Sequence, residues 1–211
     1  MSETVRRSSG GRPTAQAAAL LETMILDTAT VAFLADGYAA TSIEAIARAC
    51  GIAKRTLYAR WSGKPALFRA VLERLMAKWL SGAGDWSARE SLAEALDEAA
   101  ARILEVALTP EAIALNRLLI AESARFPELP FMMRQAGASQ GTVRIAALLE
   151  KAIASRTIQP LDTAFAAEQF LHLVLAGPQR RALGLGPALD ATQLAAWRKS
   201  AVKLFLYGIK N

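Results

Sequence analysis

The chain has 211 residues, 53% of them hydrophobic and 21% charged, so it is long enough to bury a core and too apolar to be intrinsically disordered. Its single cysteine, Cys50, excludes an internal disulfide, and its position between Ala49 and Gly51 predicts a packed side chain rather than a reactive thiol. The net charge of +6 favours a polyanionic partner, either nucleic acid or an anionic membrane surface. The first residues, MSETVRRSSGGRPTAQ, contain no apolar run long enough for a signal peptide or a spanning helix, so we expect a cytoplasmic protein with no membrane partner.

The N-terminal region reads as an amphipathic helix followed by a capped second helix. Apolar residues recur every four positions from Leu21 to Phe33, and Gly37 is expected to end this first helix. The TSIE stretch then predicts a capping box, in which Thr41 accepts a hydrogen bond from the backbone of Glu44. A short second helix therefore begins there.

Two more helices are predicted in the same region. Gly51 supplies a tight turn before a third helix over about residues 53–61. Pro65 falls in the first turn of a fourth helix that continues to about Leu80. The second and third helices, joined by a turn with glycine, have the spacing of a helix-turn-helix.

The third predicted helix carries the concentrated positive charge of the chain. Ile52, Leu57 and Trp61 share its inner face, and no acidic residue occurs between Ala45 and Ala70. Arginine can pair bidentately with guanine, and Lys, Thr or Tyr can contact bases or phosphates, so this helix is expected to read a DNA major groove. The side chains left on its outer face are Lys54, Arg55, Thr56, Tyr58 and Arg60.

The rest of the chain is also predicted to be helical. Ser87 with Glu90 predicts the start of an Ala-rich helix, and Thr109 followed by Pro110 predicts the start of the next. Gly137 predicts a kink within a helical stretch over residues 131–156. Two last helices are expected over about residues 162–176 and 190–209. No segment has the pattern of a strand, so the predicted fold class is all-α.

The last two helices are the candidate dimer interface. The helix over residues 162–176 is apolar all round, which requires burial on two sides, and the last helix has an apolar stripe. We expect a second subunit to cover them in an isologous four-helix contact. The expected interface residues are Phe170, Leu173, Val174, Leu194, Trp197, Ala201, Leu204 and Phe205.

The Phe, Trp and Met residues of the C-terminal two thirds have two interpretations, a plain core or the lining of a cavity for a small, largely apolar effector. Asn116, Glu122 and Gln169 are polar residues that would orient such a ligand. The candidate effector residues are Trp79, Trp86, Leu118, Glu122, Phe126, Phe131, Met132 and Gln169. His172 is expected to pack in the core or the interface, and no residue cluster has metal-ligand spacing, so we expect no metal and no cofactor.

The stretch GYAATSIEAIARACGIAKRTLYARWSGKPALF resembles the DNA-binding region of the TetR family of transcriptional repressors. The matching positions are Gly37-Tyr38, Thr41-Ser42, Ile46-Ala47, Gly51, Thr56-Leu57-Tyr58, Trp61 and Lys64. The resemblance implies an all-α homodimer and DNA-contacting roles for Thr41, Ser42, Lys54, Arg55, Thr56, Tyr58, Arg60 and Lys64.

The chain departs from the family pattern at Ala53, where a Ser or similar helix cap is usual, and at Trp61, where Phe is usual. The missing cap costs about 1 kcal/mol. Nearer the C-terminus, AEQFLHLVLAGPQRRALGLG resembles the corresponding region of one repressor subgroup.

We therefore expect two domains, an N-terminal arm with a three-helix helix-turn-helix domain over residues 1–64 and a helical effector-binding and dimerisation domain over residues 65–211. The expected function is a ligand-responsive repressor that binds a palindromic operator as a homodimer and is released by a small, largely apolar effector. Two alternatives stay open at this point, an architectural DNA-binding protein without an effector and a helical enzyme. The enzyme alternative lacks a nucleophile-base pair, a phosphate loop and a metal set, so no catalytic residue is assigned.

Overall fold

The computed structural model describes residues 14–81, 86 and 89–209, and within these ranges the chain forms helices and no strand. The predicted all-α class is confirmed. The N-terminal helices are α1 (Ala15–Ala40), α2 (Ile43–Ala49), α3 (Lys54–Tyr58) and α4 (Lys64–Leu80). The C-terminal elements are α5 (Leu92–Ala107), α6 (Pro110–Glu122), α7 (Glu128–Met133), a π-helical segment η2 (Arg134–Ala138), α8 (Gln140–Ala154), α9 (Thr163–Ala182) and α10 (Ala191–Ile209).

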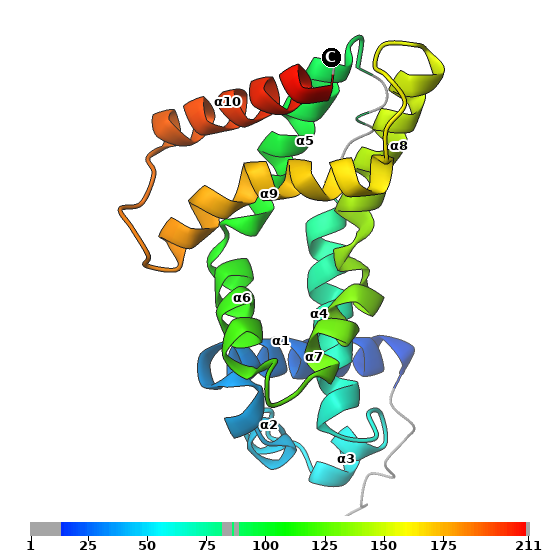
Figure 1. Ribbon diagram of the computed structural model, residues 1–211. Coiled ribbons are helices and arrows are strands. Elements are labelled where there is room, and N and C mark those ends of the chain that lie inside the picture. Colours follow the sequence, from blue (N-terminus) through cyan, green and yellow to red (C-terminus); the bar gives the residue numbers. More distant parts are fainter. Residues whose placement is uncertain (1–13, 82–85, 87–88, 210–211) are drawn as a thin grey trace, which may run out of the picture.

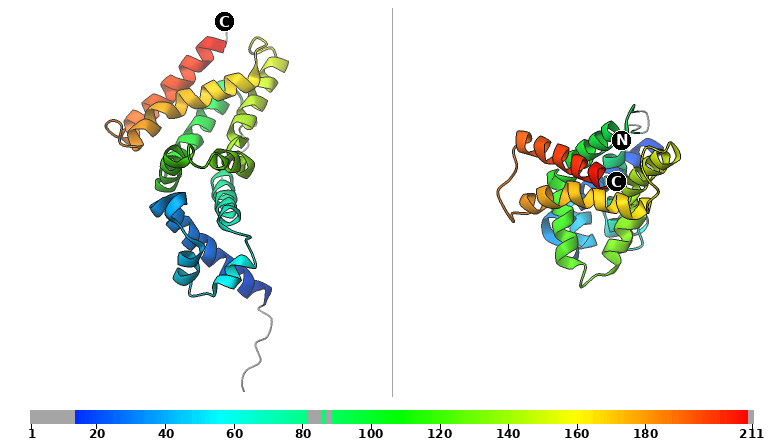
Figure 2. Two further views of the ribbon diagram at one scale, coloured as in Figure 1. Left: turned by 60° about the horizontal axis from the view of Figure 1, so that its bottom comes forward. Right: turned by 45° about the horizontal axis from the view of Figure 1, so that its top comes forward.

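The molecule is elongated, with α1, α2 and α3 at one end and α9 and α10 crossing the other (Figure 1). Helices α4 and α6 run lengthwise between the two ends, and the views in Figure 2 show the same separation. Helix α1 packs against both α4 and α6, while α9 packs against α5, α8 and α10. Helices α4 and α6 both contact α1 at one end and extend toward the other end of the molecule.

Two apolar cores lie within the part of the chain that the structure describes. The first holds Phe33, Leu57 and Phe68 of the N-terminal helices, together with Leu115 of α6 and Leu129 of α7. The second is built from α5, α8, α9 and α10, with Phe170 stacked edge-to-face on Phe205 at 5.0 Å. The first core thus crosses the domain boundary that we expected at residue 64.

The start of α2 differs from the expected capping box. Ser42 is the N-cap, and its Oγ accepts from the backbone N–H of Ala45 at 3.1 Å. Thr41 instead turns inward, where its hydroxyl donates to the carbonyls of Gly37 at 2.7 Å and Ala32 at 3.2 Å. Gly37 does break α1 as predicted, with a φ of +86° that favours glycine.

Two other boundaries needed correction. Helix α5 begins after Ser91, which forms a capping box with Glu94, whereas the predicted Ser87 cap lies outside the described residues. Helix α9 continues through Pro178 to Ala182, beyond the predicted end near residue 176. Proline inside a helix removes one backbone hydrogen bond, and sequence reasoning therefore placed a connector there.

Helix α3 ends at Tyr58, short of the predicted end near residue 61, whereas two other predictions agree with the structure. The hydroxyl of Thr109 accepts from the backbone N–H of Ala112 at the start of α6. Gly137 has a φ of +106° and kinks the chain before α8.

Helix α1 is long and apolar enough to cross a membrane by length and composition alone. This is weak evidence for a membrane span, because a mostly buried core helix and a signal sequence near the N-terminus pass the same test. In this structure Ile25, Ala29 and Phe33 of α1 are fully buried against the other N-terminal helices and α6. One face of α1 therefore belongs to the first core.

Candidate DNA-binding surface and ligand cavity

Helices α2 and α3 form a helix-turn-helix on the surface of α1. Ile46 of α2 and Leu57 of α3 are buried in the first core, and they fix the two helices to the scaffold. The turn between them contains Gly51 with a φ of +65°, a left-handed conformation that glycine adopts without strain. Helix α3 has no side-chain cap at Ala53, as its departure from the family pattern predicts.

The outer face of α3 offers donors of the kind that bind DNA. Arg55 is exposed, Tyr58 is 43% exposed, and Thr56 is half-buried beside them. Ser42, at the start of α2, is also half-buried. Within the described ranges, the exposed side chain of Arg55 has no ion pair, and its contact with a base edge stays a prediction.

Lys54 is paired with an acid that sequence reasoning overlooked. Its Nζ forms an ion pair with the carboxylate of Glu44, and it also lies 5.4 Å from the centre of the Tyr58 ring. The hydrogen bond from Lys54 lowers the pKa of Glu44, and the same bond raises the pKa of Lys54. Both side chains are about half exposed, so this ion pair contributes little to stability.

Three of the predicted DNA contacts have intramolecular roles in this structure. Thr41 is only 5% exposed, so its expected contact with DNA is corrected to a structural role. Arg60 pairs with Glu22 at 3.1 Å and donates to the carbonyl of Ala18 at 3.3 Å. Arg60 is therefore held against α1 rather than projecting from α3.

Lys64 is the third of these residues. Its Nζ donates to the carbonyls of Tyr38 at 2.8 Å and Ala39 at 3.1 Å, and it lies 4.7 Å from the centre of the Tyr38 ring. The side chain thus ties the start of α4 to the segment after Gly37. The amine is half-buried, so its main role in the DNA-free protein is to hold this segment.

The same segment is held from the opposite side by α6. The carboxylate of Glu122 accepts from the backbone N–H groups of Tyr38 and Ala39, each at 2.7 Å. A Cβ added at Gly37 would lie 2.4 Å from Glu122 Oε1, so the close approach also requires glycine there. The Tyr38 ring packs edge-to-face on Phe126, just beyond α6, at 5.1 Å. The pKa of Tyr38 is raised, mainly by burial of the phenol and then by the negative charges of Glu128 and Glu122. We call the contact between Glu122 and the two N–H groups the carboxylate clamp.

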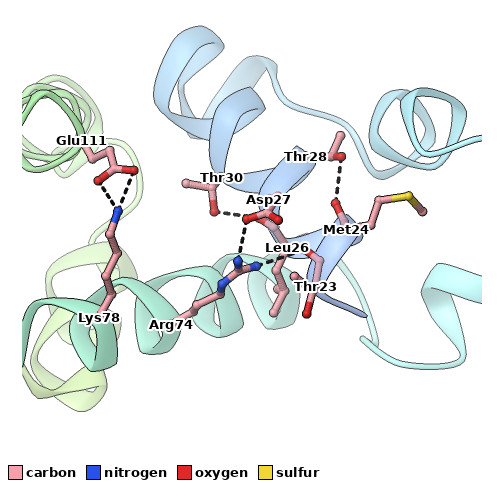
Figure 3. A network of polar contacts seen from close by, with 9 residues as sticks. All are labelled: Thr23, Met24, Leu26, Asp27, Thr28, Thr30, Arg74, Lys78 and Glu111. Atoms are coloured by element: carbon pink, nitrogen blue, oxygen red, sulfur yellow. Dashed lines mark hydrogen bonds and ion pairs between the residues drawn. The ribbon is translucent and has the colours of Figure 1, made fainter. Parts of the chain in front are cut away.

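Helix α4 makes polar contacts with both α1 and α6 (Figure 3). Arg74 donates to the carbonyl of Thr23 at 3.0 Å and pairs with Asp27 at 2.6 Å, both on α1. One turn later, Lys78 of the same helix binds both oxygens of Glu111 on α6, at 2.7 and 3.0 Å. These two exposed ion pairs join α4 to α1 and to α6, in addition to the apolar packing of the first core.

A cavity of about 340 Å³ lies between α4, α5, α6, η2, α8 and α9. Trp79 and Trp86, both predicted effector residues, line it, and so does Asn116. Leu171 and Leu175 of α9 line it as well, although the sequence suggested an interface role for this helix. The polar residues on its wall are Arg102, Asn116, Arg144 and Gln179.

The other predicted effector residues lie elsewhere. Leu118 and Met132 are buried in the first core, and Phe126 packs on Tyr38. Glu122 forms the carboxylate clamp, which excludes it from the cavity wall. The remaining two are Phe131, half exposed beside Arg134, and Gln169, which lies in a groove between α9 and α10.

The arginines on the cavity wall were missed by sequence reasoning. Arg102 occupies the Ala-rich stretch AAARILEVA. A single cation on an otherwise apolar helix face is the sequence feature that could have marked it as a polar residue of a cavity wall. Arg144 of α8 lies over the Trp86 ring at 4.1 Å, a pairing that no local pattern predicts.

The predicted dimer residues divide into two groups. Phe170, Val174, Ala201 and Phe205 are buried inside the single chain, because α9 is covered by α5, α8 and α10 of the same chain. Trp197 is also engaged within the chain, since its Nε1 donates to the Val174 carbonyl at 3.0 Å. The expectation that a second subunit must cover these side chains is therefore corrected. Leu173 and Leu194 are half-buried, and Leu204 is 62% exposed.

An apolar surface remains at the α9–α10 end. Phe165 of α9 is 60% exposed, and Leu204 and Tyr207 of α10 are 62% and 72% exposed. Phe165, Gln169, Leu173 and Leu204 border one groove. His172 is exposed in the single chain rather than packed in its core. Residues 14–81, 86 and 89–209 contain no group of three or more His, Cys, Asp or Glu suited to a metal ion.

A basic helix-turn-helix fixed to a larger helical domain defines the class of helix-turn-helix DNA-binding regulators. Residues 25–71 match the family described as bacterial regulatory proteins, tetR family, and residues 94–208 match the AefR-like transcriptional repressor, C-terminal domain. The chain belongs to the TetR family of transcriptional regulators. No match was found among curated protein sequences.

Solved structures agree with this assignment. The flavonoid-responsive regulator FrrA is 30% identical, with a TM-score of 0.74 over 91% of this chain and 98% of that one. A TetR-family transcriptional regulator from Mesorhizobium loti MAFF303099 is 27% identical, with a TM-score of 0.76 over 92% and 98% of the two chains. FadR from Bacillus subtilis, solved with stearoyl-CoA, is 18% identical and shares the fold, with a TM-score of 0.69 over 89% and 99%.

Proposed function

We propose that this TetR-family regulator is a ligand-responsive repressor that acts in the cytoplasm, binds a palindromic operator as a homodimer, and is released by a small, largely apolar effector. The observation that carries the proposal is that α4 and α6 both line the cavity and both hold residues 38–39 at the DNA-binding end, through Lys64 and Glu122. Met76 and Trp79 of α4 and Leu119 of α6 line the cavity. The clamp residue Glu122 follows Leu119 by less than one turn of the same helix.

The release mechanism follows from this shared use of helices. An effector that separates α4 from α6 moves the Lys64 and Glu122 contacts with residues 38–39, and these residues precede α2. The two α3 helices of the dimer then no longer match successive major grooves. The effector therefore favours the DNA-free conformation, and operator DNA must weaken effector binding by the same factor. FrrA, whose name records a response to flavonoids, supports a small-molecule effector for this chain.

The dimer in this proposal uses the exposed apolar side chains Phe165, Leu204 and Tyr207 at the α9–α10 end. This end lies opposite α3 in the elongated molecule, so a second copy placed there leaves both DNA-binding surfaces accessible (Figures 1 and 2). An isologous contact is the commonest way for two identical chains to bury such a patch.

The test begins with selection of bound DNA from random duplexes, which identifies the operator. Affinity for the selected duplex is then measured with and without compounds that raise the melting temperature of the protein. We expect a palindromic selected sequence and a compound that weakens operator binding. An architectural DNA-binding protein, the second candidate, is expected to select no defined sequence and to keep its affinity when a compound occupies the cavity. A transcriptional regulator is generally not an enzyme, and we propose no reaction.

A further inference from the structure

Two neutral amides on the wall of the cavity keep their hydrogen-bonding capacity unused. Asn116 of α6 and Gln179 of α9 both line the cavity, and both are half-buried. Within the described residues, neither side chain has a hydrogen-bond or ion-pair partner. An amide carries two N–H donors and a carbonyl acceptor, so these side chains offer a ligand both kinds of group.

The arginines of the same wall are already engaged. Arg102 forms an ion pair with Glu105 at 2.9 Å, and its Nη2 donates to the backbone carbonyl of Trp79 at 3.3 Å. The guanidinium of Arg144 lies 4.1 Å from the centre of the Trp86 ring, among its other interactions. An ionised ligand would therefore meet no unpaired cation among the described lining residues, and it would lose its hydration in a largely apolar cavity.

The apolar part of the wall suits an aromatic ligand. Trp79 and Trp86 line the cavity together with Met76 and Met133. Aromatic rings pack favourably on one another and on methionine sulfur, beyond the gain from burial alone. The volume of about 340 Å³ is enough for a small molecule of one or two rings.

Resting on the proposed function, we infer that the effector is a neutral aromatic molecule with a hydroxyl group that Asn116 and Gln179 bind. A hydroxyl accepts from the N–H of one amide and donates to the carbonyl of the other, so a single group uses both side chains. A carboxylate or an ether oxygen only accepts, and it leaves the amide carbonyls without a donor. An unmatched polar group in a cavity lowers affinity.

The experiment compares four probes that share the naphthalene body. They are 2-naphthol, naphthalene, 2-methoxynaphthalene, which keeps the oxygen but has no proton to donate, and 2-naphthoate, which is ionised at neutral pH. Binding to the full chain is measured by titration calorimetry, with the protein in the syringe because naphthalene is sparingly soluble. We expect 2-naphthol to bind between about 5-fold and 100-fold more tightly than naphthalene, as two neutral hydrogen bonds imply, and more tightly than the ether and the acid.

Two variants remove the amides and keep side chains of similar volume, Asn116→Leu and Gln179→Met. Each is expected to lower 2-naphthol affinity between about 2-fold and 10-fold, as the loss of one hydrogen bond implies, and to leave naphthalene affinity unchanged. Gln169→Met is the matched control, because Gln169 is also a half-buried residue of α9 but lies in the groove between α9 and α10, outside the cavity. This variant is expected to bind 2-naphthol as the unchanged protein does.

Several outcomes would overturn the inference. Naphthalene, 2-methoxynaphthalene or 2-naphthoate binding as tightly as 2-naphthol would do so, and so would the absence of 2-naphthol binding. Unchanged 2-naphthol affinity in both amide variants would also overturn it, whereas a loss in one variant alone would support the neutral ligand and assign its hydroxyl to that amide. If one variant fails to fold, the other carries the test.

The two proposals fail separately in this design. Naphthalene or 2-naphthoate binding that matches 2-naphthol and also weakens operator binding would leave the ligand-responsive function intact and refute the hydroxyl. Binding of 2-naphthol that depends on the amides but does not change operator affinity would support the ligand class and refute ligand-responsive release.

Discussion

Removal of the Glu122 carboxylate is expected to destabilise the protein far more than removal of an ordinary surface acid. The carboxylate accepts two N–H groups at 2.7 Å, and Tyr38, which supplies one of them, is almost fully buried. Hydrogen bonds to a charged acceptor contribute about 1.5–3 kcal/mol each, although water can replace the acceptor at the exposed Ala39. We therefore expect Glu122→Ala to lower the free energy of unfolding by about 2–4 kcal/mol.

Glu111→Ala is the matched control on the same helix. Glu111 also binds two protons of a partner, Lys78, but both side chains are about half exposed, so its loss is expected to cost only about 0–1 kcal/mol. Urea unfolding followed by circular dichroism measures both variants. If Glu122→Ala and Glu111→Ala lower the free energy of unfolding equally, the buried N–H of Tyr38 does not make the carboxylate clamp more stabilising than an exposed ion pair.

A double-mutant cycle with Gly37 tests the close approach itself. Gly37→Ala introduces a Cβ 2.4 Å from Glu122 Oε1 and forces alanine into a φ of +86° and a ψ of 169°. The backbone strain alone costs about 1–3 kcal/mol, and the clash adds to it. In the Glu122→Ala background the clash disappears while the strain stays, so the loss is expected to be smaller there. An identical loss in both backgrounds would show that the carboxylate does not restrict residue 37.

Three further predictions concern DNA binding and assembly. Lys54→Gln is expected to weaken binding to all duplexes and to lower the dependence of log K on log salt by about one unit in binding titrations at several salt concentrations. An unchanged slope would mean that Lys54 does not meet a phosphate. Arg55→Ala is expected to cost about 1–3 kcal/mol on the selected operator and to relax base preference, whereas equal losses on operator and random duplexes would contradict base readout. Leu204→Glu places a charge on the proposed dimer surface and is expected to yield a monomer in sedimentation. Leu185→Glu, at an equally exposed residue outside α9 and α10, is the control and is expected to stay dimeric. A dimer in both variants would place the interface elsewhere.

The helices could be predicted largely from local signals. The Thr109–Pro110 start and the Gly37 break depend on neighbouring residues alone, and both occur in the structure. Pro178 misled the prediction because tertiary packing keeps α9 helical through it. Local pattern also could not decide between Thr41 and Ser42 as the cap, since the choice depends on which hydroxyl reaches the carbonyls of α1.

The site was less predictable, because its contacts join residues far apart in the chain. The basic face of α3 follows from helical periodicity, but the acids that pair with Lys54 and Arg60 come from α2 and α1. The carboxylate clamp joins residues more than eighty positions apart in the chain. From the sequence, Glu122 was predicted to contact a ligand because it is a polar residue in an apolar helix. Only the fold reveals that its partners are backbone N–H groups.

The core that crosses residue 64 limits how this regulator can be recombined with its relatives. Leu115, Leu118, Leu129 and Met132 pack in the same core as Phe33 and Leu57, so the helix-turn-helix region has no complete interior of its own. A chimera joined at residue 64 brings a foreign α6 and α7 against α1 and mismatches their side-chain volumes. A chimera that exchanges the ligand response while keeping the DNA-binding end must therefore retain the α6 and α7 faces turned toward α1, together with Glu122.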